Sequence, residues 1–358
     1  MNGIRTDRIV RKMQERGLAS LLVSDPSTIF YLTGTWMHPG ERLLILYLDA
    51  GGSHKLFNNA LFPLEDDLGL DVVEYDDTQD AVEMIAPFLR DDGVVGIDKN
   101  WPARFLLRLQ ELKGAVRYVN GSDLADTVRM RKDTEEQERM RAVSRINDEA
   151  MGRLLERVSA CPEERRAARD LADIYEELGA ERFSFDPIVA YGPNGANPHH
   201  LPDASRLEAG DSVILDIGCV KDSYCSDMTR TFFYKNVSDK AREVYALVRE
   251  ANERGIAAVR PGARFCDVDA AARGTIDAAG YGRYFTHRTG HSIGIDVHEY
   301  GDVSAVNAAV LEEGMVFSVE PGVYLPGEFG VRIEDLVLVT RGGCEVLNRY
   351  GKELTVIG

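Results

Sequence analysis

The sequence predicts a smaller α/β domain over residues 1–125, followed by a larger α+β domain over residues 126–358. In the first region short apolar runs alternate with helical patterns, whereas the second region has long helical patterns separated by paired strands. The 358 residues suffice for two domains of ordinary size. A charged stretch at 129–137 separates the two patterns, and Thr134 with Gln137 fits a capping box that opens a helix there.

Four strands and three helices are predicted in the first region from its apolar runs and their spacing. The predicted strands are 20–23, 43–48, 72–75 and 94–97. The predicted helices are 7–16, 79–90 and 102–112. Strands that alternate with helices in this way are typical of a small α/β domain.

The second region carries the longer helices. Apolar residues recur at helical spacing over 143–158, Pro162 opens another helix that Gly179 ends, and two further helices fit 238–254 and 266–279. The predicted strands are 212–219, 224–233, 315–320 and 331–340. Because short turns separate neighbouring strands, we expect hairpins within an α+β domain.

Composition and charge exclude several classes of protein. Hydrophobic residues make up 44% of the chain, but no apolar run approaches the roughly 20 residues that a membrane span needs. The 42 Lys and Arg against 59 Asp and Glu give a net charge of −17, which disfavours nucleic acids and anionic membranes as partners and favours a cation. The first residues lack an apolar signal segment, and the five cysteines show no paired spacing. We therefore expect a cytoplasmic protein with reduced cysteines.

Two carboxylates lie within apolar strands of one predicted hairpin. If Lys221 and Asp222 form its two-residue turn, Asp216 directly faces Asp227. Opposed residues have Cβ atoms about 4.5–5.5 Å apart. Two like charges at that separation repel each other unless a cation lies between them.

A second predicted hairpin repeats this arrangement. Centring it on Gly327 sets Glu320 opposite Glu334, and Pro321 makes the pairing irregular there because it lacks a backbone donor. Four carboxylates with one or two histidines suit a pair of divalent metal ions about 3.5–4 Å apart, which is a hydrolytic arrangement. Oxygen-rich ligation favours manganese or cobalt over a thiolate-type zinc site.

One competing motif points to a serine hydrolase. Residues 290–294 match the G-x-S-x-G nucleophile elbow, with Ser292 as the nucleophile. That fold places its triad histidine later in the chain, and here only His298 follows, six residues on. Six residues cannot hold the helix, acid and returning loop of that fold, so we disfavour this interpretation.

Several segments of the second region resemble the pita-bread dinuclear metallopeptidases, which include Xaa-Pro aminopeptidases, prolidases and methionine aminopeptidases. These segments are Leu215-Asp216-Ile217-Gly218, Ser226-Asp227-Met228-Thr229-Arg230-Thr231, Gly290-His291-Ser292-Ile293-Gly294, Val319-Glu320-Pro321-Gly322 and Arg332-Ile333-Glu334-Asp335. The first region is more loosely similar to the creatinase-type N-terminal domain of the proline-specific branch, through residues 29–34. The resemblance implies a pita-bread catalytic domain preceded by that smaller domain.

The resemblance also implies the ligands of two divalent ions, with manganese or cobalt favoured. Asp227 and Glu334 would bridge both ions, and the full ligand set would be Asp216, Asp227, His291, Glu320 and Glu334. Ser292 replaces a glycine that the family carries after the metal-binding histidine, a change that removes no ligand.

Further residues receive catalytic or substrate-binding roles from the same resemblance. Glu320 would relay a proton to the leaving proline nitrogen, and His199 and His298 would hold the substrate and the developing oxyanion. The neighbouring His200 is the alternative to His199. Tyr324 and Arg332 would support proton transfer, and Arg332 would also contact the substrate.

These features predict a cytoplasmic metal-dependent Xaa-Pro peptidase that acts on short proline-containing peptides. Some prolidases carry an arginine four residues after the second histidine, where this chain has Asp302. We therefore place an Xaa-Pro aminopeptidase first and a prolidase second, with Arg332 as a possible substitute for the missing arginine.

Two alternatives stay open. One is an amidohydrolase of a small non-peptide substrate on the same scaffold, and the other is a non-catalytic pita-bread binding protein. Two other enzyme classes on this scaffold are disfavoured. Methionine aminopeptidases usually lack the first domain, and creatinase-like members have lost the metal ligands that this chain keeps. The resemblance also implies a homodimer, in which the loop at 34–40 is hypothesised to reach the neighbour's site.

Overall fold

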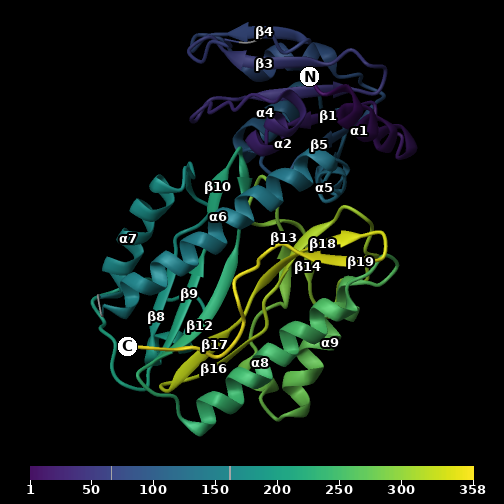
Figure 1. The fold of residues 1–358 in the computed structure, drawn as a ribbon. Coiled ribbons are helices and arrows are strands. Elements are labelled where there is room, and N and C mark those ends of the chain that lie inside the picture. Colours follow the sequence, from purple (N-terminus) through teal and green to yellow (C-terminus); the bar gives the residue numbers. More distant parts are fainter. Residues whose placement is uncertain (66, 161–162) are drawn as a thin grey trace. The chain divides into compact units, whose positions relative to one another are not determined.

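The computed structural model describes residues 1–65, 67–160 and 163–358, and these form two compact units, Met1–Arg129 and Met130–Gly358 (Figure 1). The first unit alternates strands and helices, and the larger second unit has long helices and paired strands. The predicted order of an α/β unit before an α+β unit is therefore confirmed. None of the helices described here is both long and apolar enough to cross a membrane.

A six-stranded mixed sheet forms the centre of the first unit. Its strands are β1 (Ser20–Val23), β2 (Ile45–Asp49), β3 (Lys55–Asn59), β4 (Asp71–Tyr75), β5 (Val94–Ile97) and β6 (Arg117–Asn120). Their order is β4-β3-β2-β1-β5-β6, with β1, β5 and β6 mutually parallel and β2 antiparallel to β1. All four residues of β1 are buried, as expected for a central strand covered on both faces.

Helices connect these strands and cover the sheet. They are α1 (Gly3–Glu15), α2 (Pro26–Thr33), α3 (Ala81–Ile85), the 3-10 turn η1 (Ala86–Phe88), α4 (Ala103–Leu112) and α5 (Ser122–Arg129). Val82 and Ile85 of α3 and Leu109 of α4 pack into an apolar core with the strands. The helix predicted at 79–90 is shorter than expected, because Pro87 lies in the 3-10 turn that follows α3.

Two predicted strands of this unit match exactly, 20–23 and 94–97, whereas two observed strands are absent from the sequence prediction. In β3, Asn58 and Asn59 are buried polar residues whose amides donate to Phe62 O and Asp77 Oδ1, at 2.6 and 2.9 Å. In β6, no residue is fully buried. Neither strand has the apolar alternation by which a strand is identified.

The second unit is built around long helices. They are α6 (Thr134–Ser159), α7 (Glu164–Glu177), α8 (Asp239–Ala258) and α9 (Phe265–Ala278), with 3-10 turns η2 (Gly192–Ala196) and η3 (Gly282–Tyr284). The position of Pro162, the predicted start of the second of these helices, lies outside the described residues. Gly280 follows α9 at φ 81°, which agrees with its predicted role as a helix stop.

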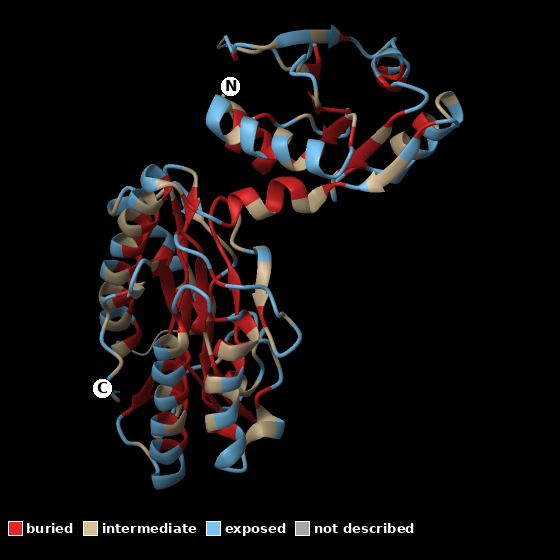
Figure 2. Ribbon diagram, turned by 90° about the vertical axis from the view of Figure 1, so that its right-hand side faces the viewer, coloured by how far each residue is buried: buried red, intermediate tan, exposed pale blue. Residues whose placement is uncertain are grey.

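Curved sheets and hairpins lie between the helix pairs (Figure 1). Their strands are β7 (Arg182–Phe183), β8 (Ile188–Tyr191), β9 (Ser212–Ile217), β10 (Cys219–Lys221), β11 (Tyr224–Cys225), β12 (Met228–Tyr234), β13 (Gly290–Ser292), β14 (Glu299–Val303), β15 (Val316–Val319), β16 (Gly322–Leu325), β17 (Phe329–Arg332), β18 (Asp335–Thr340), β19 (Gly343–Val346) and β20 (Val356–Ile357). The sheet β20-β12-β9-β8 shares a core with α6 and α7, and α8 packs with the hairpin β16–β17. Figure 2 shows buried residues concentrated on the strands and on the inward helix faces.

The capping box of α6 is formed one residue earlier than predicted. Asp133 Oδ1 accepts from Glu136 N at 3.0 Å, and Glu136 Oε2 accepts from Asp133 N at 2.9 Å. Thr134 is therefore the first helical residue rather than the cap. A carboxylate at the cap also interacts favourably with the helix dipole.

The predicted register of the first hairpin is wrong: the turn lies one residue later than predicted, so the partner of Asp216 shifts by two residues. Asp216 pairs with Thr229 and not with Asp227, because the turn consists of Asp222 and Ser223. These two residues have φ values of 48° and 68°, as a type I′ turn requires. Asp227 lies instead in the break between β11 and β12.

The predicted register of the second hairpin is confirmed on both sides of the site. Val319 pairs with Asp335, and Gly322 pairs with Arg332, so the same register runs across the gap that contains Glu320. The pairing is interrupted at Pro321, as expected for a residue without a backbone donor.

Candidate metal centre

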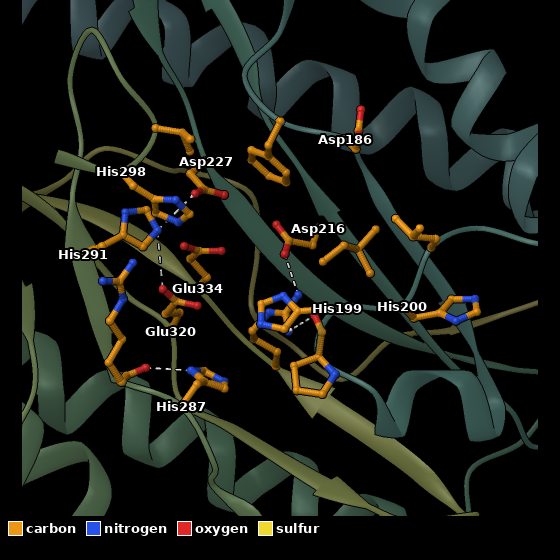
Figure 3. A pocket seen from close by; sticks show the side chains of 17 residues that line it. Asp186, His199, His200, Asp216, Asp227, His287, His291, His298, Glu320 and Glu334 are labelled. Carbon is orange, nitrogen blue, oxygen red and sulfur yellow. Dashed lines mark hydrogen bonds and ion pairs between the residues drawn. The ribbon is translucent and has the colours of Figure 1, made fainter. Parts of the chain in front are cut away.

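The predicted metal ligands converge on one cavity of about 600 Å³ in the second unit (Figure 3). They come from separate elements: β9, the break between β11 and β12, β13, and the breaks that precede β16 and follow β17. The cavity is lined by all of the predicted ligands, Asp216, Asp227, His291, Glu320 and Glu334.

Three of these carboxylates lie where strand pairing is interrupted. Asp227, Glu320 and Glu334 all fall between named strands, and each break is flanked by regular pairing. A break in a ladder re-aims side chains that strict alternation would place on opposite faces. The irregular backbone therefore allows consecutive strands to direct several acids into the same cavity.

His291 brings the carboxylates together around one point. Its Nε2 lies 3.5 Å from Asp227 Oδ2 and 3.5 Å from Glu320 Oε1, while its Nδ1 faces the Ser292 carbonyl at 3.2 Å. Ligand atoms of Asp227, His291 and Glu334 all lie within 4.8 Å of one another. A histidine that uses one ring nitrogen on a backbone carbonyl presents the other to a metal in a fixed orientation.

A glycine is required directly before this histidine. A Cβ atom at Gly290 would overlap the carbonyl group of Ser318 on β15. The hydroxyl of Ser318 accepts from His291 N at 3.0 Å and donates to Glu320 Oε1 at 3.1 Å. The close strand approach therefore positions two predicted ligands through one serine.

The donor set fits divalent cations. Oδ1 of Asp216 and Oδ1 of Asp227 are buried and have no hydrogen-bond partner among the described residues. Burial raises the pKa of Asp227 well above its ordinary value, and the charge of Asp216 raises it further. Burial and the charge of Asp227 likewise raise the pKa of Glu334. Uncompensated buried carboxylates are costly, so oxygen donors in this arrangement call for cations.

Arg332 is committed to the surrounding protein groups. Its Nη2 forms an ion pair with Asp216, its Nη1 donates to the Tyr324 hydroxyl at 2.8 Å, and its Nε donates to Thr229 Oγ1 at 3.1 Å. The side chain is buried. Burial raises the pKa of Tyr324 to about 12. The two residues predicted to support proton transfer are thus directly hydrogen-bonded, but Arg332 has little donor capacity left for a substrate.

The predicted substrate histidines also line the cavity. The ring of His298 lies 4.3 Å from that of His291, and Figure 3 shows His199 beside Asp216. Desolvation and the charges of His291 and Arg288 lower the pKa of His298 to about 4. His298 is therefore neutral at pH 7 and retains a ring N–H to donate.

His200, the alternative to His199, is held away from this centre. Its Nε2 lies 2.7 Å from Oε2 of Glu164, a fully buried carboxylate at the start of α7. Figure 3 shows His200 farther from the acids than His199. The geometry thus favours His199 for substrate contact.

Comparison with known proteins agrees with this geometry. Residues 138–341 match the model of metallopeptidase family M24, and residues 5–131 match the creatinase/prolidase N-terminal domain. The chain belongs to metallopeptidase family M24. This M24 peptidase is 34% identical to a prolidase structure from Thermococcus sibiricus, with a TM-score of 0.92 and 99% and 98% of the two chains covered.

Two further solved structures have different described activities. Dipeptidase PepE from Mycobacterium ulcerans is 33% identical, with a TM-score of 0.92 and coverage of 99% of this chain and 97% of the other. X-Pro aminopeptidase from Thermotoga maritima is 28% identical, with a TM-score of 0.83 and coverage of 97% and 100%. Both domains of the M24 peptidase are therefore shared with a prolidase, a dipeptidase and an X-Pro aminopeptidase.

The competing serine motif has no place in this site. Ser292 of the M24 peptidase is fully buried in β13 and does not line the described cavity. Its hydroxyl has no hydrogen-bond partner among the described residues, so it has no histidine base there.

Sequence reasoning missed one residue that lines the cavity, His287, and one residue beside it, Glu164, which holds His200. His287 lines the cavity, and its Nε2 lies 2.8 Å from the Tyr324 hydroxyl. Glu164 accepts from the backbone N–H groups of Tyr191 and Asp203, at 2.8 and 3.0 Å. The clustering of histidines in this region is a signal for His287, whereas the contacts of Glu164 depend on the tertiary fold.

Glu164→Gln is expected to destabilise the protein by about 1–3 kcal/mol, because one carboxylate oxygen becomes an NH2 group, which cannot accept from a backbone N–H as the oxygens of Glu164 do from Tyr191 and Asp203. Urea unfolding measures the change. Glu163→Gln is the matched control and should stay within about 0.5 kcal/mol of wild type, since among the described residues the Glu163 side chain pairs with the surface residues Arg165 and Arg206. Equal stability of Glu164→Gln and Glu163→Gln would contradict the role of Glu164 in holding the backbone at Tyr191 and Asp203.

Asp227→Asn is expected to stabilise the metal-free protein at neutral pH and to remove its response to metal. Folding raises the pKa of Asp227, so metal-free stability declines as pH rises through the window above the ordinary carboxyl pKa. Thermal unfolding with chelator at pH 5 and pH 8 should show a smaller decline in the variant than in wild type.

The metal response has its own control. Mn²⁺ at about 100 times its Kd should raise the wild-type Tm by roughly 5 °C or more. Asp186→Asn, which changes an exposed cavity residue outside the ligand cluster, should keep this response. A full response of Asp227→Asn to Mn²⁺ would overturn the assignment of Asp227 as a ligand.

Proposed function

We propose that this protein is a metal-dependent Xaa-Pro dipeptidase, which hydrolyses the bond between an N-terminal residue and proline. The observation that carries the proposal is the convergence of all the predicted ligands on one cavity of an M24 peptidase. The prolidase and the dipeptidase compared above are 34% and 33% identical to this chain, against 28% for the aminopeptidase. The prolidase and dipeptidase neighbours support dipeptides as substrates.

We assign two divalent ions, manganese or cobalt, to the carboxylate cluster. Asp216, Asp227, His291, Glu320 and Glu334 would hold them. When bound, such ions lower the pKa of a water nucleophile and polarise the scissile carbonyl group. Oxygen donors outnumber nitrogen donors in this set, which supports these metals over zinc.

The chain's own groups then handle the protons and the developing charge. Glu320, oriented by the Ser318 hydroxyl at 3.1 Å, accepts a proton and delivers it to the leaving proline nitrogen. His298, which is neutral, and His199 donate to the oxygen that gains charge. Arg332 pairs with Asp216 and donates to the Tyr324 hydroxyl, so it holds both side chains in place.

Part of the cavity wall is apolar and suits a proline ring. It includes side chains that carry no charge and present carbon atoms to the cavity, namely Phe185, Ile188, Pro198, Leu201 and Val297. A pyrrolidine ring gains free energy when it leaves water for such a surface. The combination of an acidic end and an apolar wall supports a substrate with a polar scissile bond next to proline.

An Xaa-Pro aminopeptidase is the second candidate. Asp302 occupies the position at which some prolidases carry an arginine, and that departure favours longer peptides. An amidohydrolase of a non-peptide substrate and a non-catalytic protein would both leave every Xaa-Pro peptide uncleaved.

Metal-free enzyme is expected to cleave neither Ala-Pro nor Ala-Pro-Ala, and Mn²⁺ should restore cleavage of Ala-Pro above all. Glu320→Gln should lower kcat by about 10²–10⁴-fold, because a positioned acid–base group contributes that much. Product release measured by chromatography tests both expectations. Asp186→Asn is the control variant and should keep wild-type kcat.

The substrate panel separates the candidates. Preferred cleavage of Ala-Pro-Ala would favour the aminopeptidase over the dipeptidase, and cleavage of Ala-Ala-Ala at an equal rate would remove proline specificity. Absence of all cleavage, with metal shown to be bound, would overturn the proposed function. Undiminished turnover of Glu320→Gln would overturn its catalytic role.

We also propose that the protein works in the cytoplasm as a homodimer, with the loop at 34–40 contributing to the partner's site. In the first unit the rings of Phe30, Trp36 and His38 form a continuous stack, with centroid separations of 4.5 and 5.9 Å. Stacking holds the loop in one conformation, which supports a role in recognition.

Trp36→Ala and His38→Ala are expected to raise the KM for Ala-Pro several-fold, with kcat less affected. Each substitution removes a ring of the stack that holds the loop ready for binding. Steady-state kinetics measures the change. Leu61→Ala, which removes another exposed side chain of the same unit, serves as the control. Unchanged kinetics in both loop variants, or a monomer in sedimentation that is fully active, would contradict the contribution of this loop.

A further inference from the structure

A dipeptide substrate ends in a free carboxylate next to the scissile bond, and an acidic metal centre needs a separate cation to recognise it. Arg332 does not supply that cation. Its guanidinium is buried and donates to Asp216, to the Tyr324 hydroxyl and to Thr229 Oγ1. The substitution of Arg332 for the missing prolidase arginine, expected from the sequence, is therefore not supported by its contacts.

The residue at the prolidase position does not substitute either. Asp302 lies on β14 and pairs with His291 on β13. It is not among the described residues that line the cavity. Its negative charge would in any case repel a carboxylate.

Arg288 is the other arginine or lysine among the described residues that line the cavity. Its side chain is exposed and forms no ion pair with a described residue. The group of Arg288 that is engaged is its backbone carbonyl, which lies 2.6 Å from Nδ1 of His287. The guanidinium is thus available to a ligand, unlike that of Arg332.

The backbone that carries Arg288 is fixed on both sides. Arg273 Nη2 donates to the carbonyl of His287 at 2.8 Å, and the hydroxyl of Thr289 donates to Asp269 Oδ1 at 2.6 Å. Asp269 and Arg273 also form an ion pair within α9. A charged side chain presented from a fixed backbone loses less freedom when it binds a ligand.

Arg288 also lies close to the residues that act on the scissile bond. It precedes His291 by three residues, and its charge contributes to the lowered pKa of His298. A guanidinium matches a carboxylate with two parallel hydrogen bonds.

We propose that Arg288 binds the C-terminal carboxylate of the dipeptide substrate and thereby replaces the arginine that this chain lacks at position 302. The proposal rests on the proposed dipeptidase function and names the group that selects dipeptides. Arg288 is therefore a specificity-determining residue, which contacts the substrate away from the reacting atoms.

Arg288→Met tests the proposal on the manganese-loaded, full-length protein. The KM for Ala-Pro should rise by at least about 10-fold, because a charge-assisted hydrogen bond is lost, while kcat changes less. The KM of Arg288→Lys should lie between those of Arg288→Met and wild type, since lysine keeps the charge but cannot form the two parallel hydrogen bonds. Arg283→Met is the control, because Arg283 is exposed, stacks on Tyr284 and does not line the cavity.

A binding measurement gives a readout that does not depend on turnover. L-Proline should protect the manganese-loaded wild type against thermal unfolding more than L-prolinamide does, and Arg288→Met should abolish that difference. An unchanged KM for Ala-Pro together with an unchanged preference for proline would overturn the role of Arg288. Failure of wild type to cleave any Xaa-Pro peptide would instead overturn the proposed function, whatever the proline preference shows.

Discussion

The main constraint on the second unit is that its fold brings several carboxylates together in one buried place, where their like charges repel one another. Asp227 and Glu334 have raised pKa values because both are buried and close to other acids. Such an arrangement is unfavourable in the absence of cations. Burial of the apolar strands around the acids supplies the free energy that holds the acids together. A bound cation relieves the repulsion, so the metal-free arrangement favours cation binding.

A layer of cations and hydrogen bonds behind the site keeps the acids in position. Arg230 is buried, donates to the carbonyl of Glu334 at 2.6 Å and forms an ion pair with Asp335 at 2.7 Å. Lys352 pairs with the other oxygen of Asp335. Because these groups contact backbone and neighbouring acids, they fix the position of Glu334 without neutralising its own carboxylate. The cavity therefore keeps its negative charge for a metal.

The same cavity contains the features that distinguish one peptide class from another. The ligands and His298 serve any peptide whose scissile carbonyl reaches the centre, since they act on the bond itself. The chain length that is accepted depends instead on what meets the end of the substrate. In our proposal, the exposed Arg288 and the fixed backbone around it meet the C-terminal end of the substrate. Asp302 is not among the described residues that line the cavity.

The fold class, the family and the second carboxylate pair were all predictable from the amino-acid sequence. The register of that pair was predictable because Gly327 lies at the centre of its hairpin and Pro321 interrupts the pairing beside Glu320. The sequence did not determine the register of Asp216, since the two possible turns differ by one residue and only the positive φ values of Asp222 and Ser223 distinguish them. Tertiary structure alone placed Glu164 against His200 and engaged the donors of Arg332. These contacts join residues far apart in the chain, and no local pattern of spacing or propensity encodes them.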